Sequence, residues 1–206
     1  MNNQDEIAKQ LKDNIDLVHK IEKLMTKVEI ISNNKRDMLL SAFSRNALSH
    51  FISISILIEK NLYNSAFALE RIFFENIIKL NYMYNIMNDA KITTIYNANT
   101  WNNHFPTIQN MVDEIDAESG VKFYSDIKDK AYKMMNDYTH TGTNQIARNF
   151  SESDLSIKSN FSNELILDTL KGNKTLLKTS IIIFLECIGL KNGFILENEI
   201  KEYLEY

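Results

Sequence analysis

Two side chains on one predicted helix have the types that chemistry at a phosphate requires. Arg45 and His50 lie five positions apart in the sequence RNALSH. A histidine can act as a general base on a ribose 2′-hydroxyl, or as an acid on the leaving oxygen. An arginine can hold the scissile phosphate and stabilise its developing charge. The pair predicts metal-independent RNA cleavage at Arg45 and His50. The alternative is that both belong to a polar helix face, with His50 at a helix interface.

A second set of ionic side chains lies in the most apolar helix that the sequence predicts, residues 64–87. Arg71, Glu75 and Lys79 recur every four residues, so they share one ridge of that helix. Apolar and aromatic residues surround them, which is typical of a helix at the centre of a bundle. Because an unpaired buried charge is costly, we expect Arg71 and Glu75 to bond to each other or to a polar turn.

That polar turn is the sequence DYTHTG at residues 137–142. Asp137, Tyr138 and His140 place hydrogen-bonding groups at the end of a predicted helix, and Arg148 follows shortly after. We expect Asp137 to anchor His140, since a carboxylate three residues away can orient an imidazole. A phosphate or a backbone edge could dock at these groups. Alternatively, the same groups form a buried polar contact that ties the turn to Arg71 and Glu75.

The Arg45–His50 motif resembles the signature of the HEPN superfamily of small helical ribonucleases. The resemblance implies a protein of bacterial defence or toxin type that cleaves or binds RNA. It also implies a dimer that pools two motifs into one cleft. By the chemistry of 2′-hydroxyl attack, the product would carry a 2′,3′-cyclic phosphate and the reaction would survive a chelator.

A longer stretch, about residues 40–150, resembles an uncharacterised bacterial all-helical family. The resemblance rests on SAFALERIFFE and on the later DYTHTG, against a pattern of the form SA-x-AL-x-R-P-L-F-E. This chain has Ile72 where that pattern favours proline, so a kink at that point is not expected from the sequence. The resemblance assigns no activity, but it implies a set of polar positions: Arg71, Glu75, Asp137, Tyr138, His140 and Gly142.

Hydrophobic periodicity predicts an all-α fold, a bundle of about five long helices with shorter capping helices. Only 5 glycines and 1 proline interrupt the periodic runs. We expect one all-helical domain over 1–206, with an N-terminal helix in 1–33, a core over 35–150 and C-terminal helices over 163–206. The long helices are predicted at 4–31, 35–60, 64–87, 121–138 and 163–190, with a wobble at Gly172–Asn173. A short connection makes the second and third of them an antiparallel hairpin. Two short helices in 88–116 are expected over one end, and an acidic amphipathic helix at 194–206.

Composition narrows the class of protein. The net charge of −4 argues against a broad surface for nucleic acid, although a local basic patch stays open. A single cysteine, Cys187, excludes an intrachain disulfide, and no spacing of ligands predicts a metal or a cofactor. The apolar runs are much shorter than the ~20 residues of a membrane span, and no signal pattern opens the chain, so we expect a cytoplasmic protein with no membrane contact.

Two functions from different classes follow from these patterns. One is the RNA-cleaving or RNA-binding protein described above. The other is a non-enzymatic helical module that binds a protein partner or a small ligand through a polar pocket of Arg71, Glu75 and His140. In either case we expect a homodimer, because the acidic tail and the aromatic-rich helices would leave more apolar surface than a monomer covers.

Overall fold

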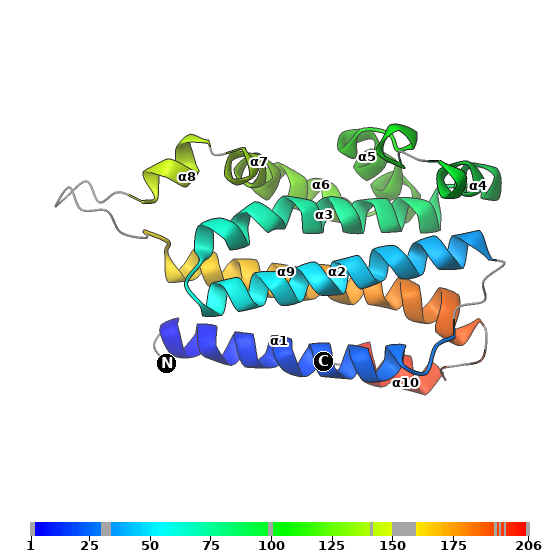
Figure 1. The fold of residues 1–206 in the computed structure, drawn as a ribbon, viewed down its shortest axis with the longest axis horizontal. Helices are drawn as coiled ribbons and strands as arrows, with labels where there is room; N and C mark the ends of the chain where they lie inside the picture. The colour runs from blue at the N-terminus through cyan, green and yellow to red at the C-terminus, as the bar shows by residue number, and fades with distance from the viewer. Residues whose placement is uncertain are drawn as a thin grey trace.

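Four long helices form the body of the protein (Figure 1). The computed structural model describes residues 3–29, 34–98, 101–140, 142–149, 160–191, 193, 195 and 197–204. The long helices are α1 (Asn3–Met25), α2 (Lys35–Glu59), α3 (Tyr63–Asn85) and α9 (Asn163–Phe184), and α9 continues into a π-helical segment, η3 (Leu185–Leu190). In Figure 1, α1 lies at the bottom, α2 and α9 lie in the middle, and α3 lies above them. No strand occurs among the described residues, which confirms the all-α prediction.

The hairpin of α2 and α3 is built as the short connection predicts. Asn34 caps α2, because its side-chain oxygen accepts a hydrogen bond from the backbone N–H of Asp37. At the other end, Asn61 turns the chain with a positive φ of 58°, a conformation that asparagine tolerates better than most residues. The two helices then run antiparallel and pack along their length, as Figure 1 shows.

The third helix is the central one. It packs against α2 and α9 on one side and against shorter helices on the other. Its apolar side chains are buried on several faces, which confirms the expectation for a helix that is apolar nearly all round. Those that are completely buried include Ala66, Phe73, Phe74, Ile77, Ile78 and Leu80.

The shorter helices follow α3 along its outer side. They are α4 (Asp89–Asn97), η1 (Trp101–His104), α5 (Ile108–Ser119), α6 (Phe123–Ile127), η2 (Lys128–Tyr132), α7 (Lys133–Thr139) and α8 (Thr143–Ala147). The helix expected over 121–138 is therefore not one uniform α-helix, because η2 is a π-helical turn between α6 and α7. A π turn carries extra residues per turn, so it changes the direction in which the following side chains point. Both α5 and α7 pack on α3.

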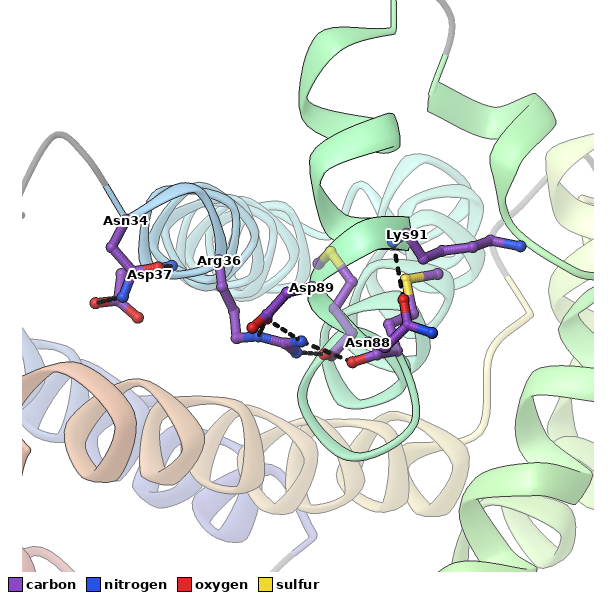
Figure 2. Close-up of polar contacts among 8 residues, drawn as sticks. Asn34, Arg36, Asp37, Asn88, Asp89 and Lys91 are labelled. Carbon is purple, nitrogen blue, oxygen red and sulfur yellow. Dashed lines mark hydrogen bonds and ion pairs between the residues drawn. The ribbon is translucent and has the colours of Figure 1, made fainter.

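Arg36 fixes the place where the start of α2 meets the end of α3 (Figure 2). Its Nη1 donates to the carbonyl oxygen of Met83, and its Nη2 donates to that of Met87 at 2.7 Å. Its Nη2 also pairs with Asp89 at 2.8 Å. The guanidinium thus satisfies carbonyl groups that the end of α3 leaves without intrahelical partners. The chain turns at Asn88, whose side chain caps α4.

The acidic tail helix, α10 (Glu197–Leu204), packs on the C-terminal part of α1. Ile200 and Tyr203 are 4% and 3% exposed, and Lys27 pairs with Glu199. The tail therefore buries these two side chains within its own chain, so it does not supply the exposed apolar surface from which a homodimer was expected.

The predicted end of the first helix at residue 31 lies outside the described residues, and α1 itself ends at Met25.

Within the described residues, no helix combines the length and the apolar character that a membrane span requires.

Candidate functional site

Four side chains from three separate segments meet beside the central helix, and we call them the polar cluster: Arg71, Glu75, Tyr132 and His140. The Nε of Arg71 donates to Oε1 of Glu75 at 2.7 Å, as their spacing on α3 predicts. Nη1 of Arg71 contacts Nε2 of His140 at 2.8 Å. The exposed fractions of the Arg71 and Glu75 side chains are 26% and 21%. The pair is therefore at the edge of the core, less buried than expected.

Tyr132 completes the polar cluster, and the sequence patterns did not identify it. Its hydroxyl donates to the same Oε1 of Glu75 at 2.7 Å. Its ring lies under the guanidinium of Arg71, with 5.6 Å between Cζ of Arg71 and the ring centroid. Tyr132 is the last residue of the π-helical turn η2. In the sequence, only the position of Tyr132 shortly before DYTHTG relates it to the polar cluster. That position becomes informative once the π turn is known.

Hydrogen bonding fixes which groups donate and which accept in the polar cluster. A guanidinium has no acceptor, so Nε2 of His140 must accept from Arg71, which places the ring proton of a neutral His140 on Nδ1. The hydrogen bond to Glu75 raises the pKa of Arg71 further above its usual value. Burial, followed by the hydrogen bond to Glu75, raises the pKa of Tyr132, so its hydroxyl stays a donor at neutral pH.

Asp137 was expected to orient His140, and the structure shows it bonded to the backbone of the turn that follows. Its Oδ2 accepts a hydrogen bond from the backbone N–H of Gln145 at 3.2 Å, and its carbonyl oxygen accepts from Gly142 at 2.7 Å. A Cβ at Gly142 would overlap the carboxylate of Asp137, so this turn requires a glycine there. Asp137 thus holds the turn into α8, while the imidazole of His140 contacts α3.

Tyr138 and Arg148 belong to an aromatic group next to the polar cluster. Tyr138 is 1% exposed, and its ring lies 5.2 Å from Phe67 and 5.9 Å from Phe161 between centroids. Burial raises the pKa of Tyr138, although nearby Arg148 lowers it. Arg148 lies over Phe161 at 5.3 Å, and Nη1 of Arg148 donates to the carbonyl oxygen of Asn160. These two predicted binding residues therefore pack the turn against α3 and the start of α9.

Arg45 and His50 both lie on α2, and the single chain does not bring them together. Five residues of a regular α-helix rotate by about 140° and rise by about 7.5 Å. Arg45 is exposed, whereas His50 is half-buried, and burial lowers its pKa. A neutral imidazole at pH 7 suits a general base. The ribonuclease hypothesis stays a prediction. Either Arg45 spans this gap across a phosphate, or a second chain supplies one of the two side chains.

A buried carboxyl group in the core was also not identified from the sequence. Glu70 is 4% exposed on α3, and its Oε1 accepts a hydrogen bond from Nδ2 of Asn173 on α9 at 2.7 Å. Burial raises the pKa of Glu70 to about 8, against the lowering effect of Asn173. Its position among Ala66, Phe73 and Phe74 on the helical wheel was a signal of burial.

The predicted wobble at Gly172 does not occur, because α9 continues through it.

The described residues contain no group of three or more His, Cys, Asp or Glu placed to hold a metal ion.

Comparison with known proteins places the chain in a family. A family model described as a family of unknown function, DUF6988, matches residues 44–185, more than half of the chain. The match includes all four residues of the polar cluster, together with Arg45 and His50. No curated protein and no solved structure matches the chain significantly.

Proposed function

The chain belongs to the family of unknown function DUF6988, and we propose that it is a non-enzymatic helical module that binds an anionic ligand or partner at the polar cluster. The observation that carries the proposal is the guanidinium of Arg71. Glu75, Tyr132 and His140 hold it from three segments, yet about a quarter of its side chain is open to solvent.

An arginine held in this way suits recognition better than a freely rotating one. Ordering a long side chain costs free energy when a ligand binds, and this cost is already met where neighbours fix the geometry. The planar guanidinium donates several hydrogen bonds in fixed directions, which matches carboxylate and phosphate groups. His140 is exposed beside it and adds a ring that a ligand can reach.

The local structure supports a binding role in a second way. The π-helical turn that positions Tyr132 interrupts an otherwise regular α-helical run. Such turns are rare, because a regular helix is the more favourable structure. Those that do occur lie frequently at functional sites. A purely structural ion pair on α3 would not require this turn.

The proposal can be tested by thermal unfolding in phosphate, in acetate and in chloride at equal ionic strength. A site with a Kd of about 1 mM would gain about 1.4 kcal/mol in 10 mM phosphate. We expect this stabilisation in the wild type and in Arg45→Gln, a matched arginine variant outside the polar cluster, and its loss in Arg71→Gln. Equal shifts in all three proteins would mean that phosphate acts through general salt effects, which would refute the proposal.

A further inference from the structure

A groove runs between α1 and α2, on the side of the molecule away from the polar cluster. Its volume is about 290 Å³, and its walls are mostly apolar. Leu11, Ile15 and Val18 of α1 face Ile52 and Ile56 of α2 across it. Figure 1 shows α1 and α7 on opposite sides of the α2 and α3 layers, so the groove is separate from the proposed binding site.

The groove leaves two large apolar side chains partly in water. Ile15 is 48% exposed and Ile56 is 52% exposed, and they come from the two helices that border the groove. Isolated exposed isoleucines are common, but two beside one apolar groove are typical of a surface that another molecule covers.

The exposed ridge of α2 next to the groove has a positive side chain at its first position and a negative one at its last. Arg45, Ser49, Ile52, Ile56 and Glu59 follow one another at steps of four and three residues, the spacing of a helix–helix seam. Arg45 is exposed and forms no ion pair in the described part of the chain. Among the described residues, Glu59 pairs with its neighbour Lys60 alone, at 3.3 Å, and both side chains are more than half exposed.

This order is self-complementary for antiparallel pairing. Arg45 lies seven residues before Ile52, and Glu59 lies seven residues after it. If two copies of α2 cross antiparallel at Ile52, Arg45 of each copy lies opposite Glu59 of the other, about 10 Å from the crossing point. Ile56 of each copy then lies near the small Ser49 of the other. Parallel pairing would instead place like charges together.

We propose that this ridge, with the groove beside it, is the interface between two copies of this chain, related by a twofold axis at Ile52. A twofold contact uses the same surface on both copies, so residue i meets residue j twice. The contact joins Arg45 to Glu59 and does not join Arg45 to His50, which lies on another face of α2. It therefore differs from the dimer that a shared ribonuclease cleft would need.

Sedimentation velocity across a range of protein concentrations tests this interface by exchanging its charges. The wild type should sediment as a species of twice 24.0 kDa at tens of micromolar. Arg45→Glu and Glu59→Arg should each weaken dimerisation by at least about tenfold, because each brings like charges together twice. The double variant Arg45→Glu/Glu59→Arg should recover the dimer. Lys91→Glu, a charge reversal on α4, is the control and should not change it.

Two further pairs of variants test the apolar part of the same surface. Ile56→Asp should give a monomer, whereas Ile146→Asp should not, although Ile146 on α8 is 46% exposed. In a Cys187→Ser background, Ile52→Cys should form a disulfide-linked dimer on oxidation, and Ser53→Cys should not.

Three results would overturn the proposed interface. These are a wild-type monomer at every concentration, a dimer unaffected by the single charge reversals, and a charge-swapped double variant that stays monomeric. The last result would reject the antiparallel register even if the two single variants were monomeric. Circular dichroism of each variant separates loss of the interface from loss of the fold.

Discussion

Replacing Glu70 by glutamine should make the stability of this protein less sensitive to pH. Glu70 is buried between α3 and α9 and accepts a hydrogen bond from Asn173 at 2.7 Å. Burial disfavours the carboxylate and raises the pKa of Glu70 from 4.5 to about 8 in the native state. Glutamine keeps an acceptor for Asn173 and cannot lose a proton.

The sign and the size of the effect follow from proton linkage. Between pH 4.5 and 8, the native carboxyl group keeps its proton while the unfolded one loses it. The native state binds more protons there, so the contribution of Glu70 to stability falls as pH rises. The difference between the two pKa values corresponds to about 5 kcal/mol in total, and about 3 kcal/mol of that falls between pH 5 and pH 8.

Urea unfolding of the wild type and of Glu70→Gln, at several values between pH 5 and pH 8, measures this directly. Other titrating groups are common to both proteins, so they cancel in the difference between the two free energies of unfolding. The advantage of the glutamine variant should grow by about 3 kcal/mol over this range. If the two curves of stability against pH are parallel, Glu70 is ionised in the native state and the reasoning is refuted.

Four further outcomes are expected. Glu75→Ala leaves two donors without their acceptor and should cost about 1–3 kcal/mol, several degrees in Tm; a melt within one degree of the wild type would argue against the polar cluster as a connected unit. Arg36→Met should cost about 1.5–3 kcal/mol, because carbonyl groups at the end of α3 lose a charged donor. Asp89→Asn should cost under about 1 kcal/mol, since the Asp89 side chain is 90% exposed, and equal losses would show that the ion pair matters more than the carbonyl contacts. Single-stranded RNA incubated in EDTA should be cleaved by neither wild type nor His50→Ala, and cleavage by the wild type alone would instead establish the ribonuclease hypothesis.

The long helices could be predicted because hydrophobic periodicity and local capping determine them. The prediction of 35–60 for the second helix compares with Lys35–Glu59, and 64–87 for the third compares with Tyr63–Asn85. The π-helical turn at Lys128–Tyr132 could not be predicted, since its side chains follow no pattern that separates it from an α-helix. Because the turn was not predicted, Tyr132 was not identified as a member of the polar cluster, since its position opposite α3 depends on the turn.

The candidate site shows the same division between local and tertiary information. The pairing of Arg71 with Glu75 follows from a four-residue spacing on one helix, which the sequence contains. The contact of His140 with Arg71 was an expected link between the turn and the ridge, whereas the carboxylate of Asp137 accepts a hydrogen bond from the backbone of Gln145. The raised pKa of Glu70 depends on how completely α2 and α9 cover α3, and only the folded chain contains that information.

The most direct measurement of Arg71 as a binding residue follows the Nε–H resonances of the arginines by NMR during titration with inorganic phosphate at constant ionic strength. The Arg71→Lys variant assigns the resonance. We predict that the Arg71 resonance, protected by its hydrogen bond to Glu75, shifts and saturates, while that of exposed Arg45 does not saturate. An Arg71 resonance that stays fixed while phosphate rises, or that moves only in step with Arg45, would contradict binding at the polar cluster.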